Sequence, residues 1–456
     1  MLHDTFATLK TVVLASLSLL CILVCGSCAQ SGEAKEVAIN STTSIPQLLE
    51  RKSNSGPKEE ADQIRKVYND AVKALESNPE DWKQYLNLAT AFISEGRVTG
   101  NTGYYSNAAI EVLQKVTQAN PSDKNILFEA MSLQSAVLLN MHQFKDALSI
   151  AEQGRKINDF NAGIYGALVD ANVEMGHYDE AVKDCDKMLS IRPDLRSYSR
   201  ASYLRQLYGD NKGAIEAMKM AVEAGVPGME STEWARVTWG DLYANTGKLD
   251  TAKMIYEAAL VYRPGYAYAE MGLARIAAAR KNYDEAITHT RNAIKELSEA
   301  SFVAYLGDMY LLKGDQEKAM ETHKEVVRLL EEGEKEQAKN AVVRHNGNRE
   351  LAMAYLNIND YDKALAYAKV DYAMRPDNID ANDLMAWILY KKGDYEAAQK
   401  YTDKMFLTKS KNANQTFKAG MVYAAAGNTD KGMQLRKEAM AISPYIDPRI
   451  TASVKN

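Results

Sequence analysis

Apolar side chains recur with helical spacing just after residue 60, which predicts an amphipathic helix over Ala61–Ser77. Beyond it a short phrase keeps returning: a Gly or polar turn residue, often an aromatic, two polar residues and an alanine. The phrase ends at Ala147, Ala181, Ala214, Ala252, Ala286, Ala319, Ala364, Ala398 and Gly432. The successive spacings are 34, 33, 38, 34, 33, 45, 34 and 34 residues, so most of the chain repeats one unit.

Other positions keep step with this phrase. A proline follows twelve residues after the alanine in four repeats, where a helix must stop because proline cannot continue it: Pro193, Pro264, Pro376 and Pro444. A small residue precedes the alanine by twelve in eight repeats: Ser135, Ser202, Gly240, Ala274, Gly307, Ala352, Ala386 and Gly420. These positions recur in step with the phrase.

In these features the sequence resembles the tetratricopeptide repeat family, whose unit is two antiparallel helices in 34 residues. The resemblance implies an all-α fold, a right-handed superhelical solenoid of about nine to ten helix-turn-helix repeats over residues 61–445, with a C-terminal tail at 446–456. An irregular repeat around Trp82 precedes the regular ones, and the helix at Ala61–Ser77 caps the open end of the array.

Three insertions break the period. The 45-residue step adds 11 residues, close to three helical turns, and predicts lengthened helices around Leu329–Tyr355 with a break at Gly333. Four extra residues at Ala224–Gly228 indicate a longer loop between repeats. About ten residues at Gly96–Tyr105 are expected to loop out between the helices of the first repeat.

The N-terminus has a different character. Thr11–Val24 is an uncharged apolar run, too short for a membrane span and of the length of a signal-peptide core. Gly26, Ser27 and Cys28 follow. This segment resembles a bacterial lipoprotein signal, which implies a signal peptide at 1–27 and lipid attachment at Cys28. Ordinary cleavage and an uncleaved anchor are the alternatives. The polar stretch 28–60 is expected to be a flexible tether.

Charge and composition exclude several classes of function. Lys plus Arg total 55 and Asp plus Glu total 60, without the basic excess of a nucleic-acid-binding protein. The histidines are not spaced like the ligands of a metal site. The glycine-rich segment Gly96–Gly103 lacks the Gly-Lys-Ser/Thr that ends a phosphate-binding loop. The sequence also contains no recognisable set of catalytic residues. We therefore expect no metal, no cofactor and no enzymatic activity, and we expect Cys185 to be a small buried hydrophobe.

The resemblance places partner binding on the concave surface, which first helices line in this family. Counting back from each alanine gives the inward positions Arg196, Arg200, Tyr203, Trp234, Asp241, Tyr268, Arg275, Tyr305, Asp308, Arg349, Asp383 and Trp387. Arginine and aromatic side chains supply much of the binding energy at interfaces. These residues are the candidates for partner contacts.

The function that follows is a membrane-tethered scaffold or assembly factor that binds partner peptides or helices. Resemblance to bacterial tetratricopeptide lipoproteins implies a place in the cell envelope, as an outer-membrane lipoprotein facing the periplasm, with secretion or envelope-assembly proteins as partners. The alternative is a polysaccharide- or peptide-handling subunit of an envelope enzyme or export complex.

Overall fold

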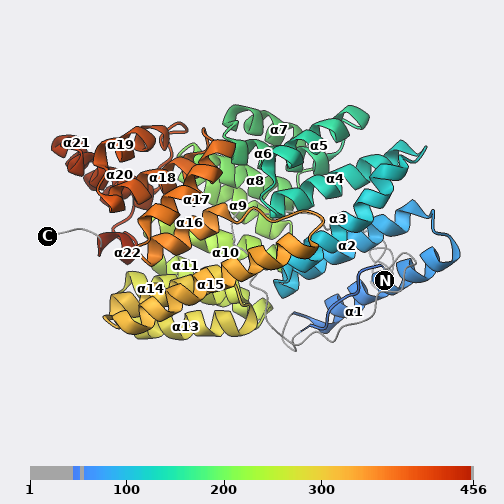
Figure 1. The fold of residues 1–456 in the computed structure, drawn as a ribbon, viewed down its shortest axis with the longest axis horizontal. Helices are drawn as coiled ribbons and strands as arrows, with labels where there is room; N and C mark the ends of the chain where they lie inside the picture. The colour runs from blue at the N-terminus through green and yellow to red at the C-terminus, as the bar shows by residue number, and fades with distance from the viewer. Residues whose placement is uncertain (1–44, 52–55, 453–456) are drawn as a thin grey trace, which may run out of the picture.

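The chain forms a succession of antiparallel helix pairs, shown in Figure 1 as a computed structural model that describes residues 45–51 and 56–452. A capping helix, α1 (Lys58–Ser77), precedes ten pairs. The pairs are α2 (Trp82–Thr99) and α3 (Thr102–Ala119), α4 (Lys124–Asn140) and α5 (Phe144–Ile157), α6 (Ala162–Met175) and α7 (Tyr178–Ile191), α8 (Leu195–Leu207) and α9 (Asn211–Glu223), α10 (Glu230–Asn245) and α11 (Leu249–Tyr262), α12 (Ala267–Ala279) and α13 (Tyr283–Glu296), α14 (Ala300–Lys313) and α15 (Gln316–Asn340), α16 (Asn348–Asn357) and α17 (Tyr361–Met374), α18 (Ile379–Lys392) and α19 (Tyr395–Lys404), and α20 (Ala413–Ala425) and α21 (Thr429–Ile442). A short helix, α22 (Pro448–Thr451), follows. The predicted all-α solenoid is confirmed.

Close contact between the two helices of a pair explains the small residues of the repeat. Ser135 and Ser202 each donate a hydrogen bond to the backbone oxygen of the phrase alanine, Ala147 and Ala214, over 2.7 Å. A Cβ added at Gly240 would lie 2.5 Å from the ring of Tyr256. The phrase alanine is itself buried in every repeat that has one. Volume at either position would push the helices apart.

The first residue of the phrase lies in the turn between the paired helices and has a left-handed backbone. Six repeats have glycine there, the residue that adopts this conformation without steric cost. The other three have His142, Lys281 and Asn359, with φ of 54°, 61° and 61°. Backbone geometry therefore selects the glycine of the phrase.

The superhelix closes on itself, because successive turns stack edge to edge. The turn inside a pair contacts the loop between the fifth and sixth pairs further along. The Tyr178 hydroxyl accepts a 2.8 Å hydrogen bond from the backbone nitrogen of Ile379, and the Asn211 side chain donates to the carbonyl of Lys411 over 3.2 Å. Arg263 pairs with Glu60 at 3.1 Å. These contacts join residues 200 to 203 positions apart, so one superhelical turn takes between five and six repeats.

The predicted insertions take a partly different form. Helix α15 is indeed lengthened, but it runs through Gly333 without a break, and α16 is short. A Cβ on Gly333 would contact nothing within 4 Å, so no neighbouring atom bends the helix there. The loop predicted at Gly96–Tyr105 is also wrong: α2 and α3 extend to leave a turn of two residues, Gly100 and Asn101. The loop at Ala224–Gly228 is confirmed.

Both ends of the described chain pack against the solenoid. The tether expected over 28–60 is wrong for residues 45–51, because Ile45 and Leu48 pack against the core and the backbone nitrogen of Leu49 donates to the Tyr105 hydroxyl. Helix α22 lies within the predicted tail. The signal segment 1–27 and Cys28 lie outside the described residues. Among the residues described, every helix is too short or too polar to cross a membrane.

Stacking of the turns predicts unequal costs for two similar glycine substitutions. Gly176 and Gly393 both have left-handed backbones, with φ of 81° and 91°. A Cβ at Gly176 would lie 2.5 Å from the backbone of Asp377 on the next superhelical turn, whereas one at Gly393 meets no atom within 4 Å. We expect Gly393→Ala to cost about 1–2 kcal/mol of strain and Gly176→Ala a further 1–3 kcal/mol, approximately, from the clash.

Urea unfolding of both variants measures this difference. Equal destabilisation by the two substitutions would contradict stacking of the turns at Asp377.

Candidate interaction surface

The first helix of each pair lines the inner side of the superhelix, where neighbouring first helices contact one another. The structure places all twelve predicted contact residues on these helices. Arg196, Arg200 and Tyr203 lie on α8, Trp234 and Asp241 on α10, Tyr268 and Arg275 on α12, Tyr305 and Asp308 on α14, Arg349 on α16, and Asp383 and Trp387 on α18. They thus all lie on first helices, as the repeat register predicts.

Ion pairs join these first helices to one another, one repeat apart. Arg275 Nη2 lies 2.6 Å from Asp241 Oδ1, and the ammonium group of Lys418 pairs with Asp383. In both pairs the partners lie in successive repeats, 34 and 35 residues apart. In these two pairs the charges of neighbouring first helices therefore neutralise each other within the chain.

Arg200 is a core residue and not a groove contact. Its residue is 1% exposed, its Nη2 lies 2.5 Å from Asp170 Oδ2, and its Nε donates to the carbonyl of Gly166 over 3.1 Å. Arg196, one helical turn earlier, is only partly buried. Desolvation lowers the pKa of Arg196 to about 9, despite the opposite effect of Asp194.

Four predicted aromatic residues also pack within the solenoid. Tyr203 and Trp234 lie against core clusters. The Tyr268 hydroxyl donates to Glu299 Oε1 over 2.6 Å, and burial together with that carboxylate raises the tyrosine's pKa. Trp387 stacks on Tyr390 with ring centres 5.1 Å apart. The fifth predicted aromatic residue, Tyr305, is 7% exposed and belongs to a core cluster, whereas these four are only partly buried.

The surface that stays open is polar. The side chains of Arg275 and Asp241 are 43% and 36% exposed. Burial lowers the pKa of Arg275, but the carboxylate of Asp241 raises that pKa overall. This ion pair therefore remains accessible on the surface.

The C-terminal segment contacts the first helices α14 and α20. The Arg449 guanidinium is 3.0 Å from Asp308 and stands over the ring of Tyr305, both on α14. The backbone nitrogen of Asp447 donates to Asn414 on α20 over 2.9 Å. Ile446 is buried among apolar residues of α20 and α21. Arg449 was not among the predicted site residues, since it lies outside the repeats and has no place in their register.

Among the described residues this surface joins no nucleophile to a general base. Cys185 is buried as expected, and desolvation raises the pKa of its thiol to about 12. Such a thiol is protonated at neutral pH and is a poor nucleophile.

Helical pairs, a closed superhelix and a polar inner surface define an α-helical repeat protein that presents a binding surface. Family models described as "Tetratricopeptide repeat" match residues 162–195 and 237–300. The chain is a tetratricopeptide repeat protein, and such proteins bind other proteins. No curated protein matches the sequence.

Several solved structures are similar over part of the chain. MamA is 17% identical, with a TM-score of 0.29, over 36% of this chain and 93% of its own. A thermophilic tetratricopeptide protein of Thermus thermophilus is 18% identical, with a TM-score of 0.35, over 47% and 99%. PilW, described as a type IV pilus biogenesis factor, is 15% identical, with a TM-score of 0.38, over 45% and 93%.

The contrast between Arg200 and Arg275 makes a second prediction. Arg200→Ala leaves Asp170 buried and unpaired, and should cost about 3–5 kcal/mol of unfolding free energy. Arg275→Ala breaks a half-exposed pair, which water compensates, and should cost less than about 1 kcal/mol. Chemical denaturation of both variants measures the two values. Similar costs would contradict the different environments assigned to these arginines.

Proposed function

We propose that the protein is a non-enzymatic scaffold that holds a partner segment along the inner surface of its superhelix. The observation that carries this proposal is the position of its own C-terminal segment. That segment contacts first helices α14 and α20 through an arginine, an acidic residue and a buried isoleucine. It is an intramolecular example of the contacts that an extended partner would make.

The charges of the surface indicate the chemistry of the partner. Arg275 and Asp241 are partly exposed on neighbouring first helices, and Arg449 is 42% exposed beside Asp308. A partner segment that carries both acidic and basic residues can replace the partners within these ion pairs, so that every charge stays paired. An extended peptide with alternating acidic and basic residues and a few apolar anchors fits this surface best. Affinity would then sum over many modest contacts.

The proposal also includes a tether to a membrane of the bacterial envelope. Its support is the sequence alone: an apolar run of signal-peptide length followed by Gly26, Ser27 and Cys28. One lipidated cysteine with further acyl chains would hold the solenoid at the bilayer without a spanning helix. Partners would then be proteins that assemble or pass through the envelope.

Photocrosslinking tests the binding surface. A photoreactive residue replaces Arg275 on the inner surface, and in a control it replaces Lys253 on the second helix α11. The two side chains have the same exposure, 43%. In native membranes we expect a discrete adduct with another protein from position 275 and none from position 253. Equal adducts, or an adduct from 253 alone, would contradict binding at the inner surface.

Membrane attachment is tested separately by Cys28→Ala. The variant should lose lipid labelling and move from the membrane fraction to the soluble fraction, because the substitution removes the acyl acceptor. Cys25→Ala, three residues earlier, is the matched control and should stay with the membrane. Unchanged membrane association of Cys28→Ala would sink the proposed anchor.

A further inference from the structure

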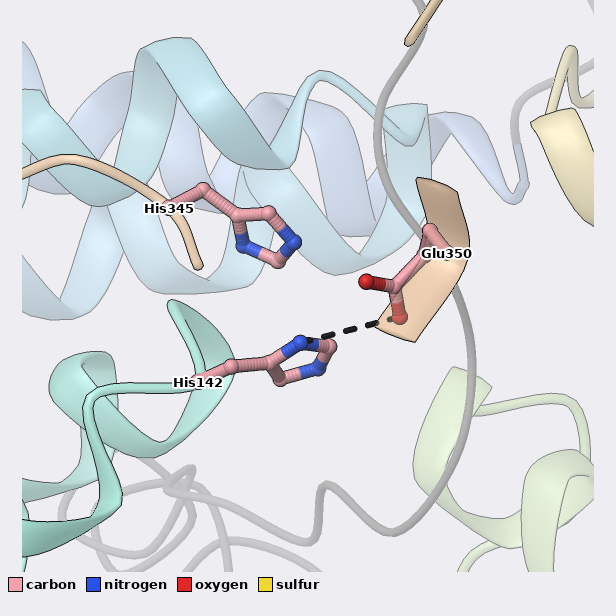
Figure 2. Close-up of side chains that lie close together, drawn as sticks. All are labelled: His142, His345 and Glu350. Atoms are coloured by element: carbon pink, nitrogen blue, oxygen red, sulfur yellow. Dashed lines mark ion pairs between the residues drawn. The ribbon is translucent and has the colours of Figure 1, made fainter. Parts of the chain in front are cut away.

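Two histidines and a glutamate meet where two superhelical turns stack (Figure 2). His142 lies in the turn between α4 and α5, His345 in the loop before α16, and Glu350 in the first turn of α16. One ligand atom from each lies within 4.8 Å of the others. His142 Nδ1 is 3.7 Å from Glu350 Oε1, and the two imidazole ring centres are 4.5 Å apart.

Backbone contacts hold the two segments together independently of these side chains. The backbone nitrogen of Asn346 donates to the carbonyl of Met141 over 2.9 Å. The Gln143 side chain donates to the carbonyl of Arg344 over 2.7 Å. The loop that carries His345 belongs to the 11-residue excess of the repeat pattern. The insertion thus places the imidazole of His345 beside the turn that carries His142, 203 residues earlier in the sequence.

Polar atoms of the cluster are buried without a hydrogen-bond partner in the structure. They are His345 Nε2, Glu350 Oε2 and, beside them, Asn140 Oδ1. Glu350 is 6% exposed. These residues line one cavity of about 220 Å³ that His142 also borders. A buried polar atom without a partner costs roughly 1–3 kcal/mol, so these three atoms can stabilise a polar ligand in the cavity.

His142 adds a backbone cost of its own. It stands at the turn position where six repeats have glycine, and its φ of 54° strains any residue with a Cβ. Lys281 and Asn359 have the same backbone conformation at this position in two other repeats. A glycine there would fold more easily but would supply no ligand.

We propose that His142, His345 and Glu350 bind a divalent transition-metal cation of the zinc type, which clasps two turns of the superhelix together. Two imidazoles and one carboxylate suit such a cation, whereas Ca²⁺ and Mg²⁺ require mostly oxygen ligands. Tetrahedral Zn–ligand bonds of about 2.1 Å place ligand atoms roughly 3.4 Å apart. Binding would therefore draw the most distant ligand atoms together by up to about 1.4 Å, and Asn140 lines the same cavity.

The cavity carries both signs of charge, because Arg97, Arg349 and Arg375 line it together with Glu174, Glu350 and Asp371. The imidazole of His345 lines this cavity together with Asn140. The backbone of Asn140 hydrogen-bonds this ring, and because Nε2 has no partner that bond leaves Nε2 directed to the cavity. The nearby cation Arg375 is paired with Asp371 and Glu174.

Zinc titration of the full-length protein tests the proposal, with melting temperature and calorimetry as readouts. We expect one equivalent to bind and to raise the melting temperature, because a ligand that binds only the folded state stabilises it. Glu350→Gln and His345→Ala should weaken zinc binding by more than about tenfold, since even outer-shell changes at metal sites cost 10–100-fold. Circular dichroism verifies that the variants remain helical.

A matched pair of substitutions separates the metal from the fold. His142→Gly and Lys281→Gly remove a strained residue from the same position of two repeats, so neither should lower the melting temperature of metal-free protein. Only His142→Gly should weaken zinc binding. Absence of zinc binding to the natural protein, or equal binding by both glycine variants, would overturn the proposal.

Discussion

The edge-to-edge stacking of successive superhelical turns is the constraint on which the rest of the structure depends. An open array of helix pairs has contacts only between neighbours. Here the turn inside one pair also contacts a loop about 200 residues later, through Asn211 and Lys411 and through Tyr178 and Ile379. These contacts convert a one-dimensional stack into a body with long-range packing, and they fix how many repeats make one turn.

Closure determines what the inner surface can do. First helices are already joined by pairs such as Asp241 with Arg275, and the C-terminal segment inserts Arg449 beside Asp308. Charges that are paired in the free protein can bind a partner only by exchange, which favours specificity over raw affinity. The same stacking brings His142 next to His345. The proposed metal ion would therefore strengthen the contact between two successive turns of the superhelix.

The helix pairs of the repeats could be predicted from the sequence, because the residues that define them pack within two adjacent helices. The buried alanine, the small residue opposite it and the terminating proline follow from packing within one unit, as Gly240 against Tyr256 illustrates. Predictions that needed distant neighbours were less successful. Arg200 looked like a groove residue until Asp170, 30 residues earlier, proved to neutralise it inside the core. No sequence spacing relates His142 to Glu350, whose proximity results from superhelical closure.

A distance measurement across two stacked turns tests this account most directly. Spin labels on cysteines at Asn211 and Lys411, in a chain whose other cysteines except the buried Cys185 are replaced, report the separation of α9 from the loop before α20. Stacking predicts one short and narrow distance distribution, because the Asn211 side chain donates to the Lys411 carbonyl over 3.2 Å. A long or broad distribution would show an open solenoid and contradict the closed superhelix.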